Sequence, residues 1–97
     1  MSAAYVISQV EVTDPKAYER YKAETPAVVA AFGGEFVVRG GRVEVLEGEP
    51  PMGRVIVTKF PSMEKALAFY HSDKHADLLK FRLASTECRR FIVEGVD

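Results

Sequence analysis

The sequence contains few of the residues on which several classes of protein depend. Cys88 is the only cysteine, so a disulfide framework is excluded. No apolar run approaches the roughly 18 residues that a membrane span requires, and the first ten residues lack the basic start and apolar stretch of a signal peptide. We therefore expect a cytoplasmic protein in a reducing compartment, without contact with a membrane.

Positive charge is not in excess either. Thirteen lysines and arginines face fourteen acidic residues, which gives a formal net charge of −1. A nucleic-acid-binding surface needs clustered cations, and the densest basic cluster is interleaved with acids. We interpret this cluster as a solvated face and predict no nucleic-acid partner; it comprises Lys80, Arg82, Arg89 and Arg90, with Asp77 and Glu87 among them.

The familiar linear signatures of enzymes are also absent. There is no phosphate-binding loop, no G-x-G-x-x-G, no G-x-S-x-G and no H-E-x-x-H, which removes most enzyme classes that such motifs mark. Cys88 has basic neighbours, but no Cys-His-acid arrangement accompanies it, so we do not expect a nucleophile. Cofactor-free enzymes have no linear signature and stay possible.

Hydrophobic patterns predict one domain over residues 1–97. Its order is β-α-β-β-α-β, with an extra helical segment before the last strand, which predicts an α+β fold: a ferredoxin-like sandwich of one antiparallel sheet with helices on one face. The strands are expected at 5–12, 35–39, 42–47, 54–60 and 90–94, and the helices from Pro15 to Gly33-Gly34, from Ser62 to about Tyr70 and from about Asp73 to Glu87.

Three details refine this expectation. Pro26 removes a backbone donor inside the first helical pattern, so we expect a kink or break near residues 23–25. The pair Gly40-Gly41 is expected to turn the chain between the strands at 35–39 and 42–47. The last helix should place Ala76, Leu79 and Leu83 on one side.

Both faces of the expected sheet carry apolar residues. Val6 and Val10 face one way while Tyr5 and Ile7 face the other, and Ile92 opposes its neighbours Phe91 and Val93. Helices can cover only one of these faces. We therefore predict a homodimer in which the second face packs against the same face of another copy.

Three segments together resemble one family, over about residues 4 to 96. They are AFGGEFVVRGGRVEVLEG, the junction FPSMEKA, and the run YHSDKHADLLKFRLAS. The family is a short, mostly bacterial one of unknown function within the dimeric α/β-barrel superfamily. The resemblance implies a ferredoxin-like subunit whose sheet pairs with a partner's to close a barrel. Superfamily relatives include cofactor-independent monooxygenases, haem-degrading enzymes, lactone isomerases and ligand-sensing domains, so no single reaction is implied.

The only two histidines, His71 and His75, have the spacing of a helical metal-binding pair. The family often has a Ser-Pro-Glu-Tyr-like sequence where this chain has residues 72–75, which implies that Ser72 caps a new helix. The two imidazoles would then not share one face, and no acidic or thiol side chain has a clear third-ligand spacing. We predict no metal site and no cofactor, and interpret His75 as a packed replacement for an aromatic residue.

Several side chains are candidates for a pocket between the sheet and the helices. A tyrosine suits a pocket wall, and an arginine can hold a carboxylate. Each has a structural alternative: the tyrosine hydroxyls at the surface, Arg39 in a turn and paired with Glu44 or Glu47, Arg82 at the surface or paired with an acid. The predicted ligand-binding residues are Tyr18, Tyr21, Arg39, Tyr70, His71, His75 and Arg82, with His71 and Arg39 as catalytic candidates.

Three functions follow as hypotheses. The first is a small-molecule-binding protein or a cofactor-independent oxygenase or isomerase, in which Arg39 holds an organic anion and a histidine acts as base. The second is a non-catalytic, metabolite-sensing or stress-associated dimer. The third is a haem or metal protein, which would need one of the two imidazoles as a ligand.

Overall fold

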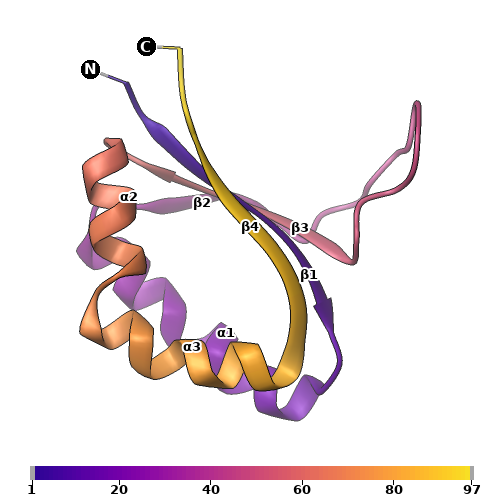
Figure 1. Cartoon of the computed structure of the whole chain (residues 1–97), viewed down its shortest axis with the longest axis horizontal. Coiled ribbons are helices and arrows are strands. Elements are labelled where there is room, and N and C mark those ends of the chain that lie inside the picture. The colour runs from indigo at the N-terminus through magenta and orange to yellow at the C-terminus, as the bar shows by residue number, and fades with distance from the viewer. Residues whose placement is uncertain (1, 97) are drawn as a thin grey trace.

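A computed structural model describes residues 2–96 of the chain. The elements are β1 (Ala4–Val12), α1 (Pro15–Ala31), β2 (Glu35–Arg39), β3 (Arg54–Phe60), α2 (Met63–Tyr70), α3 (Asp73–Ser85) and β4 (Thr86–Glu94). Figure 1 shows the three helices gathered on one side of a strongly twisted sheet. Within residues 2–96, no helix has the length and apolar character needed to cross a membrane.

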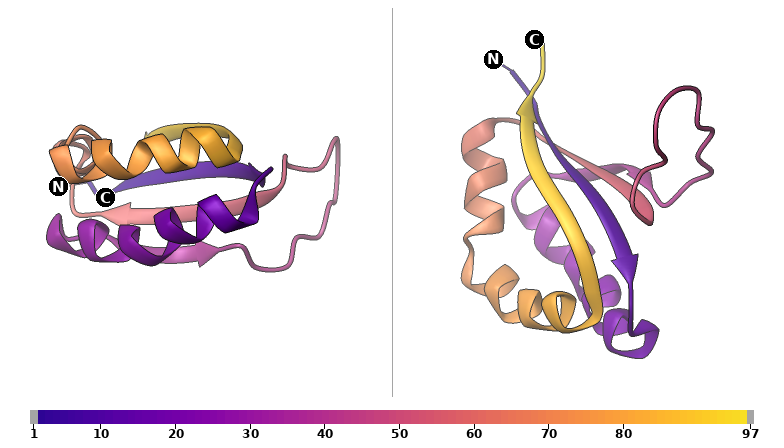
Figure 2. Two further views of the ribbon diagram at one scale, coloured as in Figure 1. Left: turned by 90° about the horizontal axis from the view of Figure 1, so that it is seen from below. Right: turned by 45° about the vertical axis from the view of Figure 1, so that its right-hand side comes forward.

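The sheet has the order β2-β3-β1-β4, and every neighbouring pair is antiparallel. The two central strands are thus the first and third along the chain, and each helical connection returns the chain to the sheet. This arrangement confirms the predicted ferredoxin-like α+β fold. Figure 2 shows α1 and the α2–α3 pair lying across the same face, with α3 beside α1.

Residue alternation along each strand gives the sheet an inner face, which meets the helices, and an open face. On β1 the inner residues are Ala4, Val6, Ser8 and Val10, all buried. Their apolar members pack with the completely buried Phe60 and with residues of all three helices. The open face carries apolar side chains as well, and among them Phe91 is 48% exposed.

Strand β2 contains a β-bulge between Phe36 and Val38. Phe36 pairs with Thr58 on the inner face, and after the bulge Arg39 pairs with Ile56, also on the inner face. Val37 is the extra residue, and it is 49% exposed. The bulge therefore directs the Arg39 side chain toward the helices, whereas uninterrupted alternation would direct it to the open face.

Of the kink or break expected in the first helix, the break is wrong, because α1 continues through Pro26 to Ala31. Proline lacks the N–H group that would bond to the carbonyl four residues earlier, which here belongs to Lys22. Arg39 reaches across from β2 and donates from Nη2 to that carbonyl oxygen at 3.0 Å. A side chain from the sheet thus replaces the missing helical hydrogen bond.

The expected strand at 42–47 is also wrong. Residues 40–53 form a long connection in which Gly40 and Gly48 have φ angles of 73° and 76°. Figures 1 and 2 show this connection projecting beyond the sheet, away from the helices. Its segment 42–47 has no neighbouring strand within residues 2–96 with which to pair, and Leu46 is 90% exposed.

The third correction concerns α3 and β4. The helix ends at Ser85 and the strand begins at Thr86, four residues before its predicted start. The expected apolar stripe is turned outward, and Leu83 is 66% exposed. Polar side chains share the buried side instead, so packing with α1 overrides the hydrophobic pattern; the buried residues are His75, Leu78, Arg82 and Ser85.

Candidate functional site

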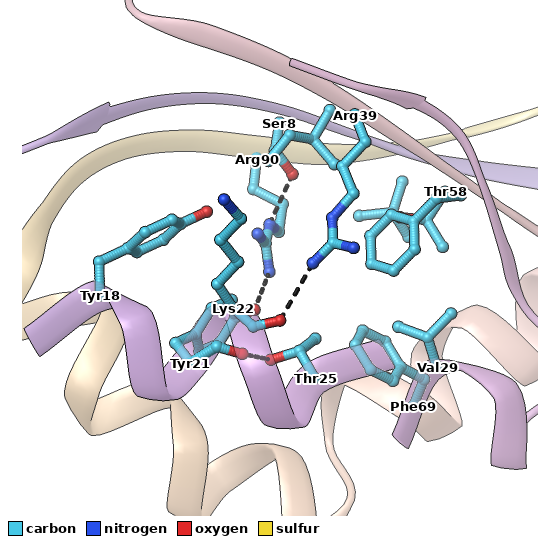
Figure 3. A pocket seen from close by; sticks show the side chains of 13 residues that line it. Ser8, Tyr18, Tyr21, Lys22, Thr25, Val29, Arg39, Thr58, Phe69 and Arg90 are labelled. Atoms are coloured by element: carbon cyan, nitrogen blue, oxygen red, sulfur yellow. Dashed lines mark hydrogen bonds between the residues drawn. The ribbon is translucent and has the colours of Figure 1, made fainter. Parts of the chain in front are cut away.

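A narrow cavity lies between α1 and the inner face of the sheet (Figure 3). The space that the centre of a water molecule can reach is about 30 Å³, which holds about two water molecules. Lys22 and Arg39 are exposed side chains in its lining. The lining consists of Val6, Ser8, Phe36, Arg39, Ile56, Thr58 and Arg90 from the strands, Tyr18, Tyr21, Lys22, Thr25 and Val29 from α1, and Phe69 from α2.

The charged members of this lining all have one sign. Lys22, Arg39 and Arg90 contribute three cations, and no aspartate or glutamate lines the cavity. Figure 3 shows both guanidinium groups in the space between the sheet and α1. Neither forms a salt bridge with a carboxylate of residues 2–96. Arg90 is partly buried, and a desolvated cation without a counterion is costly, so this cavity is suited to an anion.

Arg90 is held in place by two hydrogen bonds. Its Nε donates to Ser8 Oγ at 2.7 Å, and its Nη1 donates to the Tyr21 hydroxyl at 3.2 Å. Burial lowers its pKa, but Tyr21, Cys88 and Tyr70 together raise it by more, so the net pKa is raised and the charge is retained. Two of the five N–H groups of the guanidinium are used in this way, which leaves three to contact a ligand.

Sequence reasoning placed Arg90 on a solvated face, and this was wrong. Because β4 begins at Thr86, Arg89 and Arg90 fall on opposite faces of the sheet, and Arg90 pairs across the inner face with Ser8. A signal was present in the alternation of the strands. Ser8 is a polar residue among the inward-facing apolar residues of β1, and Thr58 is a polar residue among those of β3. Both are buried.

Arg39 is a cavity residue with a structural role. Besides its bond to the Lys22 carbonyl, its guanidinium lies over the Phe36 ring, 4.4 Å from the ring centroid. The alternative pairing with Glu44 or Glu47 is not formed, and Glu44 contacts Arg42 instead at 3.5 Å. Arg39 therefore has a fixed position at the cavity with donors to spare.

The two tyrosines of α1 are buried rather than turned to the surface. Tyr18 and Tyr21 are 6% and 5% exposed, and their rings stack with centroids 6.0 Å apart. Burial raises the pKa of Tyr18, against the opposing effect of Arg54, so this hydroxyl stays protonated. Both residues line the cavity.

His75 lies behind Tyr21, inside the core. It is completely buried, and its ring packs against Phe69 and Tyr70 with centroids 4.7 and 5.0 Å away. Its Nδ1 lies 3.0 Å from the Tyr70 carbonyl oxygen and its Nε2 lies 3.2 Å from the Tyr21 hydroxyl. Burial lowers the pKa of His75 to about 4, with Arg90 and Arg82 lowering it further and the Tyr70 carbonyl opposing them.

These bonds fix the tautomer of His75. A carbonyl oxygen can only accept, so Nδ1 must carry the proton. With its lowered pKa the ring is neutral at pH 7, so Nε2 is a bare acceptor and the Tyr21 hydroxyl donates to it. The Tyr21 oxygen in turn accepts from Arg90. Tyr21 thus joins the cavity to the buried histidine.

The other predicted residues lie outside this cavity lining. His71 is the exposed C-cap of α2, and Ser72 caps α3 by accepting from the His75 backbone N–H, so the predicted break between the histidines is confirmed. His71 is therefore not placed to act as a base in the cavity. Tyr70 lines a separate hollow at β4 with Arg90.

Arg82 takes neither of its two structural alternatives, and it does not line the cavity as predicted. It is 4% exposed rather than solvated, and no acid of residues 2–96 pairs with it. Its guanidinium carbon lies 5.8 Å from the Tyr21 ring centroid, and its Nε has no hydrogen-bond partner among these residues. Arg82 is thus a second buried cation behind Tyr21.

The described residues contain no group of three or more histidine, cysteine or acidic side chains arranged to hold a metal ion. Both ring nitrogens of His75 are already within hydrogen-bond distance of a partner, and His71 is outside the cavity lining. Neither imidazole is therefore placed as an axial ligand for a haem in this cavity.

Residues 3–96 match the sequence profile of a family described as a domain of unknown function, DUF1330. The chain belongs to this family. No curated protein matches the sequence. Membership confirms the resemblance noted from the three sequence segments, and it leaves the reaction open.

Solved structures with the same fold include two of one protein. The RPA0582 protein of unknown function from Rhodopseudomonas palustris is 17% identical, with a TM-score of 0.79 over 99% of this chain and 84% of that chain. Its methylated form is 18% identical, with a TM-score of 0.78 over 99% and 82%.

A third structure is that of an enzyme. SnoaB from Streptomyces nogalater, a cofactor-independent oxygenase, is 12% identical, with a TM-score of 0.61 over 96% of this chain and 92% of that chain. At these identities the likeness shows the fold alone. That fold is the α+β fold of the dimeric α/β barrels, as the sequence predicted.

Proposed function

We propose that the chain binds a small organic anion in the cavity between α1 and the sheet. The observation that carries this proposal is the charge of the lining, which includes three cations and no carboxylate. An anionic ligand would supply the missing counterion, and its charge-assisted hydrogen bonds would replace water at the guanidinium groups. Among the predicted residues, Tyr18, Tyr21 and Arg39 belong to this site, with Arg90 added.

The rest of the lining suits the organic part of such a ligand. Apolar and aromatic side chains surround the cations, among them Val6, Phe36 and Phe69. A molecule larger than two waters enters by displacing the exposed side chain of Lys22, because a long lysine side chain moves without any backbone change. A carboxylic acid or a phenol with a small apolar body fits these requirements.

The test compares anions with their neutral counterparts. Isothermal titration with a panel of small 2-keto acids and hydroxybenzoates should give binding that the matching amides lack. Arg90→Met keeps the length of the side chain but removes its charge, and we expect it to weaken the binding of the anion about tenfold or more. Arg20→Met is the control, because Arg20 is exposed on α1 and pairs with Glu24.

Two results would contradict the proposal. One is equal affinity for an acid and its amide, and the other is unchanged affinity in Arg90→Met with the fold intact by circular dichroism. Binding without any turnover of the same compound would instead favour the metabolite-sensing version of this function.

We also propose that two copies pair through the open faces of their sheets. The support is the apolar character of that face, where Val38, Phe91 and Val93 are each more than 40% exposed. Several exposed apolar side chains gathered on one face are typical of a protein–protein interface. The solitary thiol of Cys88 is consistent with the cytoplasmic location that we propose for the dimer.

A further inference from the structure

The hydrogen bonds around Tyr21 form a continuous chain from the cavity into the core. The chain runs from Arg90 through the Tyr21 hydroxyl to His75, and ends at the Tyr70 carbonyl. Within this chain of hydrogen bonds, the hydroxyl group of Tyr21 keeps one unused acceptor site. The Tyr21 oxygen gives its proton to His75 and accepts from Arg90, so one lone pair stays available to a ligand in the cavity.

This geometry makes Tyr21 an acceptor toward the ligand, although a tyrosine hydroxyl is usually free to donate. A ligand group next to it must then offer a proton. The cations beside it would hold the negative charge that remains once the proton has left. We propose that Tyr21, backed by His75, moves a proton from and to an enolisable or phenolic acid held beside Arg90, a proposal that rests on the anion-binding function above.

The transfer balances without any other reactant. A C–H or O–H proton of the ligand passes to the Tyr21 oxygen while the hydroxyl proton of Tyr21 passes to His75 Nε2. The ligand becomes an enolate or phenolate, Tyr21 is neutral again, and His75 becomes an imidazolium that keeps its Nδ1–H bond to the Tyr70 carbonyl. Return of the proton to another atom of the ligand completes an isomerisation.

Occupation of the cavity affects how readily His75 accepts this proton. In the free protein burial and two nearby cations hold its ring neutral. An anion beside Arg90 offsets part of that repulsion, so His75 becomes a better base when a ligand is bound. The groups facing His75 are Tyr21 of α1, Tyr70 and His71 at the end of α2, Arg82 of α3 and Arg90 of β4.

The surroundings of His75 give an independent reason to assign it a role beyond packing. Its ring lies among Tyr21, Phe69 and Tyr70, where a phenylalanine would fill the same space without burying polar atoms. Arg82 is a buried cation on the same side of α3. Polar groups buried at a cost beside a cavity are typical of a working site.

The experiment uses phenylpyruvate as the probe, because it carries both a carboxylate and an acidic benzylic C–H. In deuterated buffer, loss of the benzylic proton signal in the NMR spectrum reports proton exchange, and titration calorimetry reports affinity. The wild-type protein should bind phenylpyruvate and accelerate its exchange. At saturating probe, Tyr21→Phe and His75→Gln should each lose about 100-fold of that acceleration, with affinity changed less than threefold.

The outcomes separate this proposal from the one on which it rests. Arg90→Met should lose affinity, whereas the Tyr21 and His75 variants should lose exchange alone. Tyr5→Phe is the control, since Tyr5 lies on the open face of the sheet, and it should exchange at the wild-type rate. A wild-type protein that binds phenylpyruvate but leaves its exchange at the buffer rate overturns the relay and keeps the anion site, while absence of binding overturns both.

Discussion

At residue 75 the chain buries an imidazole among three aromatic rings, where its two nitrogens bond to Tyr21 and to the Tyr70 carbonyl. The sequence predicted this packed position, because residues 72–75 align with a family pattern that ends in an aromatic residue. It did not predict the partners of the ring. Tyr21 is 54 positions away in the chain, and a contact over such a distance depends on how α1 and α3 pack.

Burial of a neutral histidine makes stability depend on pH. In the unfolded chain His75 takes up a proton below its ordinary pKa of 6.5, whereas in the folded protein it does so only near 4. The unfolded state therefore binds more protons between these values, and stability falls as the pH is lowered from about 6.5 to about 4. This histidine should contribute a loss of about 3 kcal/mol.

Urea denaturation of the wild type and of His75→Phe at pH 7 and pH 4.5 measures this contribution. The difference in unfolding free energy between the two pH values should be smaller in His75→Phe. His71→Gln is the matched control, since His71 is exposed, and it should keep the wild-type dependence. An identical dependence in His75→Phe and wild type would show that folding leaves the pKa of His75 unchanged.

Cations were harder to place from sequence than aromatic residues. Arg39, Tyr18 and Tyr21 were predicted to line a ligand pocket; all three line the cavity, and their role in binding stays a prediction. Arg90 was missed because β4 begins four residues earlier than predicted, which puts Arg90 within the strand and on its inner face rather than at its exposed end. The polar residues on the inner face of the sheet were a better guide than the local charge pattern.

At the scale of elements, α1 depends on a residue of β2. The Lys22 carbonyl has lost its helical partner at Pro26 and accepts from Arg39 instead. Sequence alone marks the proline and predicts a break, since it cannot show that a guanidinium from 17 positions away replaces the bond. The helix and the sheet edge should therefore be thermodynamically coupled through these two residues.

A double-mutant cycle tests this coupling. Arg39→Met should cost about 1 kcal/mol more unfolding free energy in the wild type than in the Pro26→Ala background, where the substitution restores a backbone N–H for the Lys22 carbonyl. Loss of the contact with Phe36 occurs in both backgrounds and cancels. The exposed Arg42→Met should show no coupling to Pro26→Ala. Additive effects of Arg39→Met and Pro26→Ala would contradict the assignment.

The segment 42–47 is the clearest case in which a local pattern did not decide the structure. Its alternation of Val43 and Val45 with charged residues is typical of a strand, but a strand needs a neighbour. Both valines and Leu46 are exposed, and the segment projects away from the helices, on the side where we propose the second copy (Figure 1). Within a single chain the pattern therefore has nothing to pair with.

At the scale of the whole molecule, the overall fold was the most predictable feature. It depends on the order β-α-β-β-α-β, and the loss of the expected strand at 42–47 leaves that order intact. The dimer remains a proposal from the apolar open face. Phe91→Asp would place a charge on that face, where Phe91 is 48% exposed, and burying it against a second copy would be costly.

Sedimentation measures this directly. The wild type should have twice the mass of the 10.8 kDa chain, and Phe91→Asp should have the mass of one chain. Leu83→Asp is the control, since Leu83 is 66% exposed on α3, on the helical side of the molecule, and it should stay a dimer. A wild-type monomer at micromolar concentration would exclude the dimer. A dimer in Phe91→Asp would place the interface on another face.

The bulge at Val37 has a consequence for how this site can change during evolution. A bulge shifts the in–out alternation of a strand by one residue. The charge of Arg39 therefore reaches the cavity only while the bulge lies between Phe36 and Val38. A relative with the same residues but a regular β2 would present that arginine on the opposite surface. One insertion or deletion before Arg39 can thus exchange a ligand contact for a surface charge without any substitution, and identity at position 39 alone does not identify the relatives that share this pocket.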